Sequence, residues 1–195
     1  MKVVVFPLEA MLCPRGRVSV RVFEAQYLDA IKDCMKNDLP LVSVAINPQA
    51  KGGVDLPFYR QGCLAKVVDF DLDDDGVLAV VLEGVESVLF TQTYRTDKKL
   101  WYADCEPVSA STHSDERSQH LPQNYDDLIE ILKALVKHPS IEELNLTIDY
   151  EDAEQVSLRL VELLPLPLEE KQRLYEQPEL VSRLESISQT VLEMI

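Results

Sequence analysis

Hydrophobic and polar residues alternate in the segment 17–23 (RVSVRVF), where Val18, Val20 and Val22 alternate with charged or hydroxyl side chains. A repeat of two residues is typical of a half-buried β-strand. Other short runs rich in β-branched and aromatic residues are separated by turn-forming pieces such as NPQAKGG and RTDKK. The pattern predicts strands at residues 3–6, 17–23, 41–46, 63–70, 77–82, 85–94 and 101–108.

One helix is predicted among these strands. Between residues 24 and 36, the apolar residues Tyr27, Leu28, Ile31 and Met35 recur at helical spacing. Many short strands with a single early helix favour a closed or half-closed barrel over a doubly wound parallel sheet.

The last third of the chain has a helical pattern. After the polar stretch SASTHSDERSQHLPQN, apolar residues recur every three or four positions from Leu128 to Val136. We therefore predict an α+β protein with a β-barrel subdomain at 1–110, a polar connection at 111–123 and a helical subdomain at 124–195. Further helices are predicted at residues 152–164, at 168–175 and from 178 to the end.

The acidic stretch DFDLDDDGVLAVVLEG could be a metal-binding loop or a turn. Asp71, Asp73, Asp75 and Gly76 match the first, third, fifth and sixth places of an EF-hand calcium loop. The twelfth place needs a bidentate glutamate but holds Leu82, and the flanking segments are rich in β-branched residues rather than helical. The sequence therefore predicts a β-hairpin that turns at the Asp-Gly pair, with a charged tip in solvent.

Composition restricts the partners. The 195 residues carry 34 acidic and 19 basic side chains, and the formal net charge of -15 opposes binding to nucleic acid or to anionic membranes. No apolar run reaches the roughly 18 residues of a membrane span, and Pro7 and Glu9 interrupt the first run before signal-peptide length. We expect a cytoplasmic protein without nucleic-acid or membrane partners, whose four separated cysteines are plain buried or half-buried thiols.

Sequence motifs for catalysis are absent. The chain has no Walker A motif, no G-x-S-x-G, no G-x-G-x-x-G and no cysteine or histidine pair at zinc-site spacing. His113, His120 and His138 fall in the polar connection or at a helix end, where a solvated role is expected. We predict no catalytic residue, no metal site and no cofactor.

The N-terminal segment VVFPLEAMLCPRGRVSVRVFEAQYLDAI resembles the opening of the Lon protease N-terminal domain in its free-standing bacterial form. Both have a strand ending in F-P-L, a P-x-G turn, a strand ending in R-V-F-E, and Y-L opening a helix. Gly62, Ala65, the Asp-Gly turn, Gly84 and the segment LVELLPLPLEEKQRLYEQPELVSRLESI extend the likeness. The matching residues of the first segment are Phe6, Pro7, Leu8, Pro14, Gly16, Arg21, Phe23, Glu24 and Tyr27.

The resemblance implies a PUA-like β-barrel with one early helix, followed by a C-terminal helical bundle. It also implies recognition of polypeptide substrates, which is a role of this domain in the full protease. The ATPase and peptidase activities of a full Lon protease belong to domains further along its chain. We therefore expect no enzymatic activity from these 195 residues. Gln26 and Ser87 stand where the family pattern has basic residues, so the contacts of those basic residues are not carried over.

The leading hypothesis is a non-enzymatic module that binds unfolded or apolar polypeptide segments, with a Lon protease as a further candidate partner. The candidate contact residues are Phe6, Arg21, Phe23, Glu24 and Tyr27, although the three aromatic rings could instead fill the junction between barrel and helix. The alternative is a small-molecule sensor or enzyme with a pocket at the junction of barrel and helical bundle, using Arg21, Glu24 and a tyrosine. RNA binding, known for some PUA-like domains, is disfavoured by the net charge.

Overall fold

The structure, a computed structural model, describes residues 2–51, 56–72, 76–97, 99–108 and 122–194. It divides into two compact units, residues 1–108 and 109–195. In the described residues, the first unit holds all the strands and one helix, and the second holds the remaining helices. The predicted α+β class, with strands followed by helices, is confirmed. Most of the predicted polar connection lies outside the described residues.

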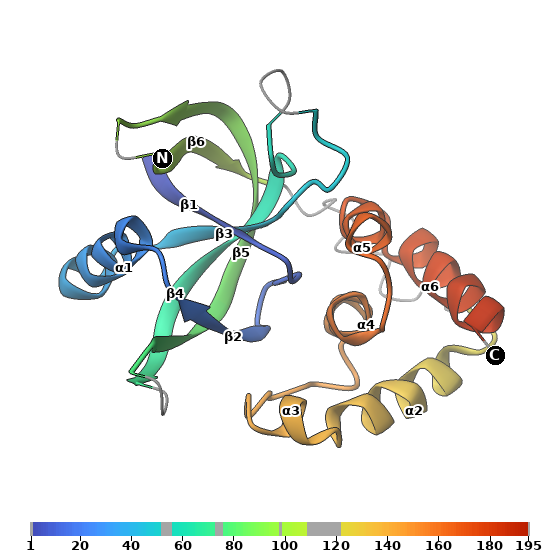
Figure 1. The fold of residues 1–195 in the computed structure, drawn as a ribbon. Coiled ribbons are helices and arrows are strands. Elements are labelled where there is room, and N and C mark those ends of the chain that lie inside the picture. Colours follow the sequence, from blue (N-terminus) through green and yellow to red (C-terminus); the bar gives the residue numbers. More distant parts are fainter. Residues whose placement is uncertain (1, 52–55, 73–75, 98, 109–121, 195) are drawn as a thin grey trace. The chain divides into compact units, whose positions relative to one another are not determined.

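The described strands are β1 (Lys2–Leu8), β2 (Arg17–Val22), β3 (Leu41–Ala45), β4 (Gln61–Leu72), β5 (Leu78–Arg95) and β6 (Trp101–Pro107). They form one mixed sheet in the order β2-β5-β4-β3-β1-β6 (Figure 1). Because β5 also pairs with β6, the sheet curls back on itself, while β2 stays at an edge. β1 and β3 are parallel, and the other pairs are antiparallel. This barrel-like sheet is consistent with the predicted PUA-like fold.

β1 is apolar on both of its faces. Val3 and Val5 belong to one buried cluster, and Phe6 and Leu8 belong to another. The alternation of side chains along a strand explains why neighbouring residues reach different clusters. Every residue of β3, which pairs with β1, is likewise buried. These two strands therefore form the centre of the first unit.

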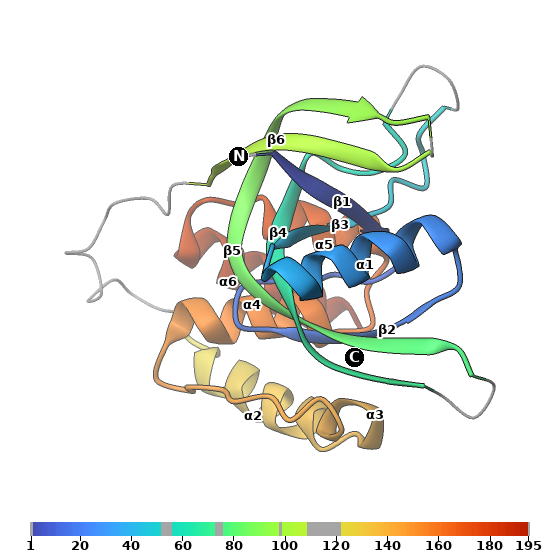
Figure 2. The same cartoon turned by 90° about the vertical axis from the view of Figure 1, so that its left-hand side faces the viewer.

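One helix, α1 (Ala25–Asn37), lies against the sheet (Figure 2). Ile31 and Cys34 of this helix are buried in the same cluster as Phe6. The helix is capped by Asp38, which has a left-handed backbone (φ 52°) and donates its N–H to the carbonyl of Cys34. The observed bounds agree with the helix predicted from the apolar spacing.

β5 is one continuous strand, and the predicted pair of strands separated at Glu83 and Gly84 is wrong. Gly84 marks a close backbone approach instead of a strand end. Its N–H donates to the carbonyl of Gly16 (2.9 Å), and its carbonyl accepts from the N–H of Arg15 (2.8 Å). A Cβ at this position would lie 2.1 Å from the carbonyl oxygen of Cys13. The glycine thus allows β5 to continue beside the segment that precedes β2.

The helices of the second unit follow the predicted pattern, apart from one short addition. The longer helices bury their apolar residues, and α4 packs against α2, α5 and α6. The four-residue helix α3 was not predicted, because it is too short to show a helical repeat. The helices are α2 (Tyr125–Val136), α3 (Pro139–Glu142), α4 (Ala153–Leu163), α5 (Leu168–Tyr175) and α6 (Leu180–Met194).

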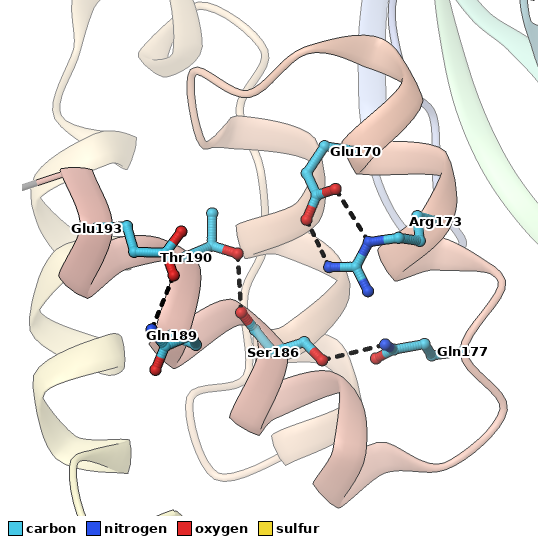
Figure 3. Close-up of polar contacts among 7 residues, drawn as sticks. All are labelled: Glu170, Arg173, Gln177, Ser186, Gln189, Thr190 and Glu193. Atoms are coloured by element: carbon cyan, nitrogen blue, oxygen red, sulfur yellow. Dashed lines mark hydrogen bonds and ion pairs between the residues drawn. The ribbon is translucent and has the colours of Figure 1, made fainter.

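Polar contacts around a buried arginine connect α4 to α6. Arg183 is only 5% exposed, and its guanidinium donates to Glu154 Oε1 (2.7 Å), to Ser157 Oγ (3.0 Å) and to the carbonyl of Gln177 (2.7 Å). The side chain of Gln177 in turn donates to Ser186 Oγ on α6 (3.1 Å; Figure 3). Burying the arginine charge is tolerated because a carboxylate and neutral acceptors surround it.

Candidate functional site

Two of the five predicted contact residues pack against each other. The rings of Phe6 on β1 and Tyr27 on α1 meet edge to face, with 4.9 Å between their centroids. Phe6 is buried and Tyr27 is half-buried in the cluster under α1. Burial raises the pKa of the Tyr27 hydroxyl, the charge of Glu24 raises it further, and Arg95 opposes the shift. The pair anchors α1 to the sheet and offers little surface to a ligand.

Arg21 and Phe23 form a second, separate pair. The Arg21 guanidinium lies over the Phe23 ring, 5.3 Å from its centroid. Phe23 is 66% exposed, so it does not fill a junction between helix and sheet. Glu24 precedes α1 without capping it through its side chain, and it accepts a hydrogen bond from Gln26 Nε2 (2.6 Å). Gln26 thus serves as a local partner of Glu24.

Four of the five predicted residues thus form two pairs, one packed in the cluster under α1 and one on the surface. Phe6 is buried and Tyr27 half-buried, so Arg21 and Phe23 offer more surface to a ligand. A different surface nearby combines exposed apolar side chains with an open strand edge. It consists of β2, residues 66–72 of β4 and residues 78–83 of β5, and we call it the outer sheet.

One face of the outer sheet is polar. Arg17 on β2, Glu83 on β5 and Lys66 on β4 are direct neighbours across the three strands. Arg17 donates to Glu83 Oε2 through Nε (2.9 Å) and Nη2 (2.7 Å), and Lys66 Nζ lies 3.6 Å from Glu83 Oε1. The hydrogen bond from Arg17 is the main reason why the pKa of Glu83 is lowered. These pairs connect the three strands through half-buried side chains of Arg17 and Glu83 and an exposed Lys66.

The opposite face of the outer sheet is apolar and only partly covered. Val80 is fully buried in the cluster under α1, and its direct neighbour on β4 is Phe70. Leu78 is the neighbour of Leu72. Side chains directly opposite each other in an antiparallel pair share a face, so Phe70 and Leu72 continue the apolar surface of the cluster. They are nevertheless 58% and 65% exposed.

Along this apolar surface, the outer edge of β4 has no described strand beside it. Among the described strands, β3 pairs with β4 at residues 63–65, and beyond that point the pairing of β4 is with β5. The backbone N–H groups of Phe70 and Leu72 donate to Asp69 Oδ1 (2.9 Å) and Asp71 Oδ1 (2.8 Å). Side-chain carboxylates thus accept hydrogen bonds from backbone N–H groups that could otherwise donate to a further strand.

The prediction from sequence missed this surface, although its signal was present. The letters D-F-D-L-D alternate acidic and apolar residues with the period of a strand. The sequence predicted a strand ending at Phe70 and a charged tip in solvent from Asp71 to Gly76. β4 instead continues to Leu72, and the side chains of Phe70 and Leu72 share one face.

The calcium-loop alternative conflicts with the flanking structure. An EF-hand needs a helix on each side of its loop, whereas β4 and β5 flank this stretch as paired strands. The predicted hairpin is thus confirmed as a pairing, in which Leu72 lies opposite Leu78. Gly76 has the positive φ of 76° that a tight turn uses. The tip residues 73–75 lie outside the described residues.

Cysteine chemistry is not favoured in this structure. Cys13, Cys34, Cys63 and Cys105 are all buried free thiols, as predicted. Burial is the main cause of the raised pKa of Cys34 and of Cys105. A raised pKa reduces the thiolate form, which is the nucleophile. In the part of the chain that the structure describes, no group of three or more histidine, cysteine or acidic side chains could hold a metal ion.

A comparison with family models gives a match to the ATP-dependent protease La (LON) substrate-binding domain over residues 2–192. The chain belongs to the LON substrate-binding domain family. This is a family of non-catalytic domains. The predicted resemblance to the Lon N-terminal domain is thereby confirmed.

Solved structures of LON substrate-binding domains resemble this one over nearly its whole length. A Lon N-terminal domain protein from Xanthomonas campestris is 25% identical, with a TM-score of 0.70 and 96% of each chain covered. The N-terminal domain of the Mycobacterium avium complex Lon protease is 14% identical, with a TM-score of 0.67 and the same coverage, and this second likeness shows the fold alone. A comparison with curated proteins finds no match.

Of the helices in the described residues, none combines the length and the apolar character needed to cross a bilayer.

Proposed function

We propose that this protein binds unfolded or apolar segments of other polypeptides and catalyses no reaction on them. Membership of the LON substrate-binding domain family supports binding of protein substrates in general. The observation that carries the proposal is the exposure of Phe70 and Leu72 on the apolar face of the outer sheet. We expect the protein to act in the cytoplasm, with a Lon protease as a further candidate partner.

The energetic argument rests on the position of these two side chains. Burying one large apolar side chain stabilises a complex by about 1.5–3 kcal/mol. Phe70 and Leu72 extend the apolar surface of a strand that is already paired with β5, so a ligand that covers them meets a strand that is already formed. An apolar peptide segment can lie on such a surface through contacts that do not require a defined sequence.

The test is binding of a permanently unfolded polypeptide to the full chain. We would label reduced, carboxymethylated α-lactalbumin with a fluorophore and follow its anisotropy as protein is added. In the double variant Phe70→Ser/Leu72→Ser, the Kd should rise about tenfold or more, because loss of both apolar contacts exceeds about 1.4 kcal/mol. Phe23→Ser tests the competing surface, since Phe23 has a similar exposure and stays a candidate for contact.

Each outcome has a defined meaning. If the unmodified protein does not bind the polypeptide, the proposed function is wrong. If Phe23→Ser abolishes binding and the double variant does not, the polypeptide uses the surface of Arg21 and Phe23, and the outer sheet is the wrong site. Circular dichroism of both variants shows whether a loss of binding reflects unfolding.

A further inference from the structure

The open edge of β4 specifies the kind of polypeptide that fits the outer sheet. Along residues 66–72, this strand has β5 on one side and no described strand on the other. An exposed strand edge presents backbone donors and acceptors to which an extended peptide can add as a further strand. The exposed apolar side chains lie on this same stretch, so backbone pairing and apolar contact are available together.

Two backbone N–H donors on this edge of β4 are hydrogen-bonded to side-chain carboxylates that another acceptor can replace. The N–H groups of Phe70 and Leu72 are two residues apart, and strand geometry directs such groups to the same side. Each donates to the carboxylate of the preceding residue, Asp69 or Asp71, and both aspartates are exposed. A carboxylate in solvent can turn away when another acceptor and a cation replace its contacts. The aspartates therefore discourage indiscriminate strand pairing and leave the edge usable.

The two faces of this edge differ in chemistry. Phe70 and Leu72 point to the apolar face, and Asp69 and Asp71 point to the polar face, because side chains alternate along a strand. A strand added to β4 places its own alternate side chains beside these two sets. Apolar residues suit the first set and lysine or arginine suits the second. The net charge of -15 strengthens this preference.

We propose that the edge of β4 at residues 66–72 binds an extended peptide segment in which apolar and basic residues alternate, as an added β-strand. This inference rests on the proposed function and makes it more specific. The apolar residues of the segment cover Phe70 and Leu72, its basic residues pair with Asp69 and Asp71, and its backbone takes over the N–H groups of β4.

The experiment uses four short capped peptides and the full chain. The first alternates valine and lysine, the second has the same composition in two blocks, the third has glutamate in place of lysine, and the fourth is the first peptide with N-methyl groups on alternate residues. The alternating peptide should bind about tenfold more tightly than the block peptide, because several cross-strand pairs form only with alternation. The glutamate and N-methyl peptides should bind no better than the block peptide.

Variants and hydrogen exchange locate the binding. Asp69→Asn/Asp71→Asn should weaken binding of the alternating peptide several-fold, while Asp29→Asn/Asp33→Asn, which changes the net charge equally on exposed positions of α1, should not. The amide protons of Phe70 and Leu72 should exchange more slowly in the complex. Equal binding of the N-methyl peptide, or unchanged exchange at both amides, overturns strand addition.

The proposed function and this inference can fail separately. If unfolded α-lactalbumin binds through Phe70 and Leu72 but the alternating peptide binds no better than the block peptide, the inference is wrong and the proposed function stands. If neither the unfolded polypeptide nor any peptide binds, both are wrong.

Discussion

The centre of the sheet and the outer sheet differ in how far the two faces of their strands are buried. β1 and β3 bury both of their faces, and each face meets an apolar cluster. In the outer sheet, one face carries the pairs of Glu83 with Arg17 and Lys66, and the other is apolar but partly exposed. The apolar side chains of the centre are therefore covered by the fold itself, whereas the outer sheet leaves apolar side chains exposed.

The difference indicates where function and stability separate in this family member. A large exposed apolar residue contributes little to the stability of the fold. When several such residues lie together on one surface, they indicate a binding site. Variants at the centre should therefore lower stability, and variants in the outer sheet should lower binding. Trp101, the single tryptophan of the chain, belongs to β6 and reports on unfolding of the first unit.

The largest expected effect comes from replacing a buried phenylalanine by alanine, compared with the same replacement of an exposed phenylalanine in the outer sheet. Phe58 is 1% exposed, and its ring meets those of Phe90 and Trp101 edge to face. Phe58→Ala should cost about 3–5 kcal/mol of unfolding free energy, because it removes buried contacts and leaves a cavity. Phe70→Ala should change stability by no more than about 0.5 kcal/mol. Urea unfolding followed by Trp101 fluorescence measures both.

Equal losses for the two variants would break the comparison. They would mean that Phe70 is as much a part of the core as Phe58, and the outer sheet would then have no apolar surface left for a ligand. Because Phe58 touches Trp101, circular dichroism should repeat the measurement with a probe that does not depend on that contact.

A smaller effect is expected at the glycine where β5 passes the segment before β2. Gly84→Ala should destabilise the first unit by up to about 3 kcal/mol, because the new Cβ would meet the carbonyl oxygen of Cys13, which is backbone and cannot move away cheaply. Gly76→Ala is the matched control. Its Cβ would meet nothing within 4 Å, but its φ of 76° should still cost about 1 kcal/mol. Thermal unfolding of the two variants shows whether close approach or backbone angle matters more.

The order of these two losses is the informative result. If Gly76→Ala is the more damaging, the requirement at Gly84 is weak, and the continuity of β5 does not depend on its close contact with Cys13.

The periodic parts of the fold could be predicted from sequence because they depend on burial alone. The alternation in residues 17–23 gave β2 its apolar and polar faces, and the helical spacing around Ile31 placed α1 within one residue of its observed bounds. The break predicted at Gly84 was wrong because the need for a glycine there comes from a tertiary contact. No local pattern distinguishes a glycine that ends a strand from one that admits a neighbouring backbone.

The candidate site was harder to predict than the fold. The resemblance selected Phe6 and Tyr27, whose rings the structure packs against each other, and Phe23, which the structure leaves exposed. Phe70 and Leu72 carry a strand alternation in the sequence, but their exposure depends on how far α1 covers the sheet. Coverage of a face is a property of the assembled fold, and a sequence pattern does not contain it.

The smallest expected effect concerns the polar face of the outer sheet and depends on pH. Arg17 lowers the pKa of Glu83 in the folded protein, so the ion pair stabilises the fold above the ordinary value of 4.5 and is lost as the pH falls through the lowered pKa. Glu83→Gln should therefore cost about 0.2–1 kcal/mol at neutral pH and progressively less in acid below 4.5. Urea unfolding of both proteins at neutral and acidic pH measures the difference, with the exposed Glu106→Gln as control. A cost that stays constant as the pH falls below 4.5 would show that Glu83 stabilises the fold through packing rather than charge. The polar face of the outer sheet would then contribute to stability in the same way as the buried centre of the sheet.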